Sequence, residues 1–471
     1  MVSRLSPRDA MFYFLDEGGS STQLGALLII PATDDRRRLD YPRLVSLVEN
    51  RLQTMPRYRQ IVRQVTLGLA RPVWADDPDF DINFHIRRSG LPRPGGIEQL
   101  QDLIARVMAR PLDRTRPLWE MYLIEGLADG TMAILTKSHR CLVGGSGSPE
   151  ISEVICDESP DTAALPEDLW MPGAVPGGAQ LALGALAEAL SRPGDLVDSL
   201  VSGNGPVADL RATAGATARR VGSVVQQLTD SAPSSPLNNA TTSSRMFTVA
   251  TVPTDVCDRI ASAHGFSRTD VVLALLTGAM RRWLMSFGDA VSGVETVRVV
   301  LPLSAQDPMV DPDPDSPRRW VIVGTPGFVT DLPVGEDNPT VRLAQVAELA
   351  QRHSQSSRRV SLGLRPLLPE LGVVPFAEIS SRAFSTLDRR SYNVPVTMGT
   401  GPVGPRFVCG LPVAEIYAVP ALLAQRALAV TIVDHGGRLQ FAFLADRGVL
   451  SDLPAMAEYV TESLDELVTE D

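Results

Sequence analysis

The part of the chain that decides the fold lies around two segments, Arg110-Pro-Leu-Asp-Arg-Thr-Arg-Pro-Leu-Trp-Glu120 and Lys137-Ser-His-Arg-Cys-Leu-Val-Gly-Gly145. The residues between and before them alternate in hydrophobic period. Strand-like apolar runs cover 24–30, 121–124 and 132–136, and helical patterns cover 41–53 and 97–109. This alternation predicts a mixed α/β domain, which we place at residues 1–156.

The remainder of the chain divides into a connector and a second α/β block. Residues 157–244 are rich in Pro, Gly, Ala and Ser, with helical patterns near 179–190 and 210–228, and we expect a crossover connector that carries helices. Residues 245–471 predict a second domain of similar size. Its expected strands lie near 246–252, 297–301, 320–328 and 428–433, and its expected helices near 269–285, 340–354 and 452–467.

The helix expected at 269–285 has a distinctive beginning and interior. Ser267-Arg-Thr-Asp270 supplies polar residues suited to a helix N-terminus. The pattern continues with Ala274, Gly278 and Ala279, small residues that suit close packing. We expect a buried core helix.

Composition narrows the function classes. The chain has 471 residues and a net charge of −11, which would repel nucleic acid, so no nucleic-acid partner is expected. Lys137 is the single lysine, and the arginine bias is typical of a GC-rich bacterial genome. The four cysteines (141, 156, 257 and 409) form no Cys-x-x-Cys pair, which argues against a zinc site or a disulfide framework and suits a reducing cytosol.

Targeting signals are not indicated. Residues 1–9 carry two arginines and an acid and lead into no hydrophobic signal-peptide core. The longest apolar runs, near 26–30 and 271–276, fall short of the roughly 20 residues that span a bilayer. We therefore expect a cytoplasmic protein, in which any membrane contact is peripheral.

Common nucleotide, hydrolase and metal motifs fail on specific residues. Gly144-Gly-Ser-Gly-Ser148 lacks the Gly-Lys-Ser/Thr ending of a phosphate loop and the second glycine of a Gly-x-Ser-x-Gly elbow. The acidic run 307–315 is interleaved with prolines and lacks calcium-loop spacing. We predict no metal site.

The five histidines can be weighed one by one. His139 follows a predicted strand and precedes a glycine-rich turn, which makes it the best catalytic candidate. His85 alternates as a strand residue would. His264, His353 and His435 adjoin Gly or Ser in polar stretches; we expect them to be exposed and assign them no role.

With these motifs the chain resembles the bacterial wax ester synthase/diacylglycerol acyltransferase family, of the mycobacterial and actinobacterial type. Apart from the connector, the resemblance covers nearly the whole chain. Its further elements are Leu5-Ser-Pro-Arg-Asp9, Trp74 with Asp77-Pro-Asp-Phe-Asp81, Leu91-Pro-Arg-Pro-Gly-Gly96, Asp270-Val-Val-Leu-Ala274, Asn393-Val-Pro395, Glu415-Ile-Tyr417 and Leu444-Ala-Asp-Arg447.

The resemblance implies an architecture and a reaction. It implies two chloramphenicol-acetyltransferase-like domains, of the CoA-dependent acyltransferase type, joined by a crossover segment with a channel between them. It also implies acyl transfer from acyl-CoA to diacylglycerol or a long-chain alcohol, with acyl-CoA as substrate or ligand and no further cofactor. In the family signature, His-His-x-x-x-Asp-Gly, the second histidine is the general base, which takes the proton of the attacking hydroxyl.

This chain departs from that signature. It reads His139-Arg140-Cys-Leu-Val-Gly144-Gly145, so Arg140 stands at the position of the family base and Gly144 at the position of the family aspartate. Arginine stays protonated and offers only donors, so Arg140 cannot accept a proton. His139 could replace the base only if the extended segment slipped by one residue, because neighbours in a strand point to opposite faces.

Other expected channel positions also drift from the family pattern. The candidate channel residues are Gly145, Thr269, Asp270, Thr325 and Asn393. The family usually carries asparagine where Thr269 stands, and Gly-Asn where this chain has Gly324-Thr325.

Three functions stay open on these residues. The first is a slow acyltransferase with His139 as base, and the second is a non-catalytic acyl-CoA- or lipid-binding pseudoenzyme. The third is a partner of an active paralogue that docks through the connector helices. The apolar pattern of these helices also fits contact with a lipid droplet or the inner membrane surface, and it fits packing within the chain, which we favour. The Arg140 guanidinium is either solvated or aimed at a phosphate or carboxylate in the channel.

Overall fold

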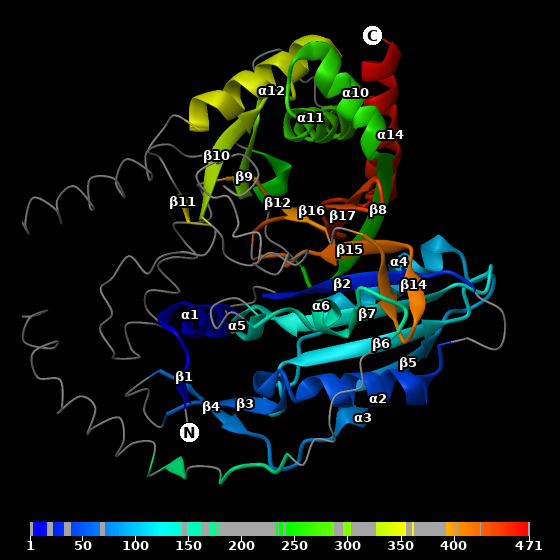
Figure 1. The fold of residues 1–471 in the computed structure, drawn as a ribbon. Helices are drawn as coiled ribbons and strands as arrows, with labels where there is room; N and C mark the ends of the chain where they lie inside the picture. Colours follow the sequence, from blue (N-terminus) through cyan, green and yellow to red (C-terminus); the bar gives the residue numbers. More distant parts are fainter. Residues whose placement is uncertain are drawn as a thin grey trace, which may run out of the picture.

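The fold was analysed in a computed structural model of the chain. It describes residues 3–16, 22–32, 39–65, 71–143, 148–161, 170–174, 177, 178, 180, 232–233, 235–238, 242–286, 295–302, 326–354, 360–361, 392–401, 404–423 and 425–469. Figure 1 shows two sheet-centred halves, one above the other. Apart from residue 180, the predicted connector helices lie outside the described residues.

The N-terminal half is built on a mixed sheet of five described strands in the order β15-β2-β7-β6-β5. The β5–β6 pair is parallel and the other pairs are antiparallel. The strands are β2 Gln23–Ile30, β5 Ile86–Gly90, β6 Trp119–Glu125, β7 Met132–His139 and β15 Glu415–Val419. The strand predicted at 132–136 therefore continues to His139, and the candidate residue is the last of a central strand.

Helices cover both faces of this sheet. α1, α2, α5 and α6 pack on one face in a core that includes Phe12, Leu44 and Ile134, and α4 packs on the other with Ile104 and Leu135. Their bounds are α1 Pro7–Leu15, α2 Tyr41–Leu52, α4 Ile97–Ala109, α5 Arg140–Val143 and α6 Ile151–Ile155. Three further strands, β1 Ser3–Arg4, β3 Gln60–Arg63 and β4 Val73–Asp76, form a small separate sheet.

The C-terminal half contains a second mixed sheet, whose described strands run β11-β10-β9-β12-β16-β17-β8. The strands are β8 Arg245–Pro253, β9 Val297–Pro302, β10 Pro326–Leu332, β11 Val360–Ser361, β12 Val394–Thr400, β16 Leu428–His435 and β17 Arg438–Asp446. The helices α10 Thr254–His264, α11 Arg268–Ser286, α12 Pro339–Ser354 and α14 Pro454–Thr469 gather on one side of it (Figure 1). The helices predicted here agree with α11, α12 and α14 to within two residues.

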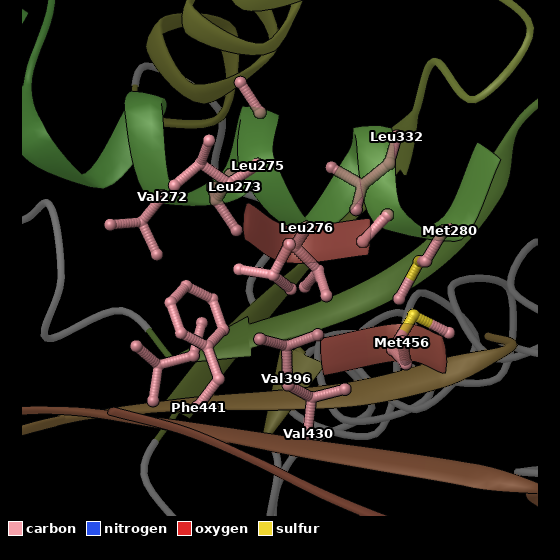
Figure 2. Packing of buried hydrophobic residues seen from close by; sticks show 14 of the residues in the cluster. Val272, Leu273, Leu275, Leu276, Met280, Leu332, Val396, Val430, Phe441 and Met456 are labelled. Carbon is pink, nitrogen blue, oxygen red and sulfur yellow. The ribbon is translucent and has the colours of Figure 1, made fainter. Parts of the chain in front are cut away.

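α11 is the central helix of this layer. Figure 2 shows Leu276 above Val396 and Val430 of the sheet, and Met280 beside Met456 of α14. A Cβ at Gly278 would lie only 2.5 Å from Ser463 Oγ of α14. The close packing predicted from the small residues of this helix is thus present. It depends on Gly278, because any side chain at this position would collide with α14.

The two halves share a crossover element. β13 Arg406–Val408, β14 Leu411–Val413 and β15 all follow the C-terminal strand β12 in sequence, yet β15 pairs with β2 of the N-terminal sheet, with Glu415 opposite Ile29. The predicted ranges 1–156, 157–244 and 245–471 assign these strands to the second domain. In the structure, apolar residues of 406–419 are buried in the N-terminal core, so these strands pack with the first half.

Candidate active site

The site signature lies where β7 ends and α5 begins. The backbone N–H of His139 donates to Leu118 O at 2.9 Å, and that of Arg140 donates to Thr22 O at 3.0 Å. The segment is therefore held by β6 on one side and by the start of β2 on the other. Gly144 and Gly145, the expected aspartate and glycine positions, lie outside the described residues.

Both ring nitrogens of His139 are engaged. Nδ1 accepts the backbone N–H of Cys141 at 3.1 Å, which places the ring proton on Nε2. Nε2 lies 2.9 Å from Thr22 Oγ1, and Thr22 in turn contacts Asp16 Oδ1 through its N–H at 3.2 Å and its hydroxyl at 3.3 Å. The ring is 1% exposed. In this arrangement the lone pair of the imidazole faces the Cys141 N–H.

Burial sets the charge of this imidazole. It lowers the pKa of His139 to about 4, against the opposing effect of Asp16, whose Oδ2 lies 3.7 Å from Nε2. His139 is therefore neutral at physiological pH, and its contact with Asp16 is not an ion pair. Arg114, which stacks on Tyr13 at 4.2 Å, adds to the lowering.

Arg140 is the first residue of α5. Its guanidinium carbon lies 4.3 Å from the ring centre of Phe12 on α1, a cation–π contact. The side chain is half-buried. The guanidinium is thus not fully solvated, and it places a permanent charge within the signature, next to His139.

The opposite face of β7 carries a buried acid. Ser138 Oγ donates to Glu150 Oε1 at 2.9 Å, and the Ser152 N–H donates to Glu150 Oε2 at 2.8 Å. Burial raises the pKa of Glu150. This carboxyl group caps α6, so its acceptor positions serve the fold.

Asp270, a predicted channel residue of the C-terminal half, caps a helix. Asp270 Oδ2 accepts from Ser267 N at 2.9 Å and from Ser267 Oγ at 2.7 Å, while Ser267 Oγ accepts from Asp270 N, so the two residues cap α11 reciprocally. Thr269, between them, is half-buried. The capping role predicted for this segment is present.

Asn393 is fully buried at the start of β12. Its Oδ1 accepts from Arg298 N at 2.8 Å, and its Nδ2 donates to Pro233 O at 3.0 Å and to Asn238 Oδ1. It therefore ties β9 and β12 to residues at the end of the connector. Thr325 lies outside the described residues.

Two expectations about the other histidines were wrong. His85 ends a short helix, α3 Ile82–His85, and its ring is stacked between Phe80 and Trp119 at 5.3 and 4.6 Å. Its Nδ1 donates to Trp119 O at 2.8 Å, and burial lowers its pKa to about 4. His435, expected to be exposed, is 4% exposed because it ends the central strand β16.

Sequence reasoning missed Thr22, Asp16 and Glu150. Thr22 lies 117 residues from His139, and no local pattern connects them. Asp16 and Glu150 stand in or beside glycine-rich stretches that carry no recognisable acid motif. Among the described residues, no group of three or more His, Cys, Asp or Glu is placed to hold a metal ion. None of the described helices is long and apolar enough to cross a bilayer.

Two mixed sheets joined by a crossover strand, with a histidine at the end of a central strand, define a protein with the CoA-dependent acyltransferase fold. The chain belongs to the wax ester synthase/diacylglycerol acyltransferase family. The model of the family's catalytic domain matches residues 5–272, and that of its C-terminal domain matches residues 327–468.

Relatives and solved structures agree with this assignment. A probable diacylglycerol O-acyltransferase of Mycobacterium tuberculosis, tgs3, is 47% identical over 54% of this chain and 94% of its own length. A second one, tgs1, is 30% identical over 95% of this chain and 91% of its own. The wax ester synthase/diacylglycerol acyltransferase of Marinobacter aquaeolei VT8 has a TM-score of 0.68 at 21% identity, with 99% of both chains covered.

A more distant group shares the fold alone. The starter condensation domain of rhizomide synthetase has a TM-score of 0.53 at 12% identity and covers 99% of this chain and 94% of its own.

Proposed function

We propose that this chain keeps the acyl-CoA-dependent scaffold of its family but performs the family's acyl transfer weakly or not at all. The observation that carries the proposal is that the signature offers no proton acceptor. Arg140 occupies the position of the family base, and both ring nitrogens of His139 are engaged.

The chemistry explains why this loss matters. An alcohol that attacks a thioester carbon must give up its proton, while the CoA thiolate leaves and takes one up. An Arg140 guanidinium has no lone pair for that proton. The Nδ1 lone pair of His139 is already used by the Cys141 N–H. Loss of a general base costs on the order of 10²- to 10⁴-fold in rate, or about 3 to 5.5 kcal/mol of barrier.

Reversion of the signature tests the proposal. We expect the double variant Arg140→His/Gly144→Asp to raise transfer from labelled palmitoyl-CoA to diacylglycerol or hexadecanol by on the order of 10²- to 10⁴-fold. The matched control is Arg140→Gln/Gly144→Asp, which removes the same charge without supplying a base, and it should stay near the native rate. Native turnover close to that of relatives with the intact signature would contradict the proposal.

The second candidate is a non-catalytic acyl-CoA- or lipid-binding protein, acting alone or with an active paralogue. The whole-chain likeness to a wax ester synthase/diacylglycerol acyltransferase, and the permanent charge of Arg140 beside the signature, favour it. The related condensation domain was solved with an eight-carbon acyl-CoA, so that fold accommodates such a ligand. On this proposal the chain works in the cytoplasm, with its contact at a lipid body or the inner membrane surface as a further expectation.

Binding measurements separate the two candidates. We expect the native chain to bind palmitoyl-CoA in calorimetry without consuming it, and Arg140→Ala to weaken binding by roughly tenfold if the guanidinium meets a phosphate. Arg88→Ala is the matched control, because Arg88 is an exposed arginine paired with Glu125 on β5 and β6. A folded native chain that binds no acyl-CoA would exclude the binding function.

A further inference from the structure

Lys137 is the one basic position of this chain that is not an arginine. The other 43 basic residues are arginines, whereas Lys137 stands two residues before His139 on β7 and is 0% exposed. A buried cation requires partners, because burial without hydrogen bonds strongly disfavours the charged form. The contacts of this side chain therefore indicate its role.

The ammonium group binds the end of α4. Nζ donates to Val107 O at 2.8 Å and to Arg110 O at 2.5 Å. Val107 O also accepts the Arg110 N–H at 3.3 Å, and Arg110 is the residue that caps the helix. The C-terminal end of a helix carries negative partial charge, which favours a cation there. A compact ammonium can direct two donors to two separate carbonyls, whereas the planar fork of arginine suits a bidentate acceptor.

We propose that Lys137 is a positioning residue. Its hydrogen bonds to the end of α4 fix the register of β7, and this register sets the positions of His139 and residue 140 in the site. This inference rests on the proposed function only in taking position 140 as that of the family base. Lys137 and His139 alternate along β7 and so share one face, with Glu120 of β6 opposite Lys137. A one-residue slip would turn the ammonium away from both carbonyls and towards the apolar core on the other face.

The charges around Lys137 are consistent with an ammonium group held in one place. Burial lowers the pKa of Lys137 to about 8, Glu120 and Asp16 oppose that lowering, and Arg110 and Arg87 add to it. Arg87 pairs with Glu120 at 3.2 Å, so this carboxylate also balances a second cation. Both the ammonium and the amine can donate to the two carbonyls, and the contact persists through this titration.

The native chain offers a direct measurement, since lysine-selective ¹³C/¹⁵N labelling produces a single lysine side-chain signal in NMR. We expect that signal to titrate near pH 8 and its Nζ protons to exchange slowly. A lysine that titrates at its usual value near 10.4, with fast exchange, would overturn the proposal.

Variants then test the effect on the site. In Lys137→Met we expect the imidazole of His139 to leave Thr22, so that its ¹⁵N-detected pKa rises from about 4 by one pH unit or more. Lys137→Arg should stay closer to the native value. The control Val107→Ala removes packing at the same helix end but keeps the carbonyl, and should leave the His139 signal unchanged. An unchanged His139 signal in folded Lys137→Met would refute the positioning role.

Kinetics in the reverted background distinguish this inference from the proposed function. When Lys137→Met is added to Arg140→His/Gly144→Asp, we expect kcat to fall about tenfold while KM for acyl-CoA changes less than twofold. An equal rise in KM with kcat intact would count against positioning. If the native chain turns over at the rate of relatives with the intact signature, the proposed function fails, and the NMR measurements still decide the role of Lys137.

Discussion

At the scale of single residues, His139 and Arg140 meet opposite surroundings although they are neighbours. The imidazole is buried and neutral, with its proton fixed on Nε2 by the Cys141 N–H at the other nitrogen. The guanidinium is half-buried on the ring of Phe12 and keeps its charge. Two adjacent residues therefore hold a neutral imidazole and a permanently charged guanidinium.

The neutral imidazole predicts loss of stability in acid. The unfolded chain protonates this histidine near pH 6.5, whereas the folded chain does so only near pH 4. Between these values the unfolded state binds more protons, so the free energy of unfolding falls as the pH falls, and the full contribution is present above pH 6.5. The contribution is at most about 3 kcal/mol.

Denaturant unfolding of the native chain and of His139→Gln at several pH values measures this contribution. We expect the variant to lose less stability than the native chain between pH 6.5 and 4.5. The difference between the two at pH 7.5, where the imidazole is neutral in both states, is the control for lost packing. Parallel pH profiles for the two proteins would show that the prediction is wrong.

At the scale of elements, close approach of backbones decides how α11 packs. Reciprocal caps from Ser267 and Asp270 begin the helix, and Gly278 lets α14 approach it. In this crossing Arg342 of α12 is also buried, and its guanidinium donates to Glu466 Oε2 of α14 at 3.0 Å. Three helices thus meet at a point where there is no room for a side chain.

Gly278→Ala is expected to destabilise the protein by about 1–3 kcal/mol, although alanine ordinarily stabilises a helix relative to glycine. The reason is that a Cβ would lie 2.5 Å from Ser463 Oγ and 3.0 Å from Ser463 Cβ. Thermal unfolding of Gly278→Ala, Ser463→Gly and the double variant gives the coupling energy between the two positions. We expect the double variant to be more stable than the sum of the two single effects predicts.

The matched control for this substitution is Gly90→Ala, because a Cβ at Gly90 meets nothing within 4 Å. If Gly278→Ala and Gly90→Ala change the melting temperature equally, the steric explanation fails.

At the scale of the whole molecule, β15 joins the two sheets. One edge of β15 pairs with β2, while side chains of the C-terminal sheet bind its backbone: Gln440 Oε1 accepts from Ile416 N at 2.8 Å, and the Thr431 hydroxyl donates to Ala418 O. A shared apolar core that includes Leu135 and Leu444 lies between the halves. The halves are therefore expected to unfold together.

Gln440→Leu tests this coupling. It leaves the buried N–H of Ile416 without its acceptor, which costs about 1–3 kcal/mol. We expect calorimetric unfolding to shift to lower temperature and to broaden towards two transitions. Gln345→Leu, which alters a glutamine within the C-terminal half, is the control and should keep a single transition. A single unshifted transition in Gln440→Leu would contradict the coupling.

Much of the fold follows from local pattern. The runs at 41–53, 97–109 and 428–433 predict α2, α4 and β16 because apolar period depends only on neighbouring residues. His85 was misread because four residues are too few to distinguish a helical turn from a strand. His435 was misread because a polar, glycine-flanked sequence can still end a central strand.

The sequence by itself determined the family scaffold and the His139-Arg140 pair that carries the proposed loss of the base, because both follow from the order of residues along the chain. Only the tertiary structure decided that β15 lies in the N-terminal sheet and that the lone pair and the proton of His139 are both engaged. The physical reason is distance along the chain: β15 pairs with a strand almost 400 residues away, and Thr22 contacts His139 across 117 residues. Hydrogen bonds between residues so far apart in the chain depend on tertiary packing, and no local period records them.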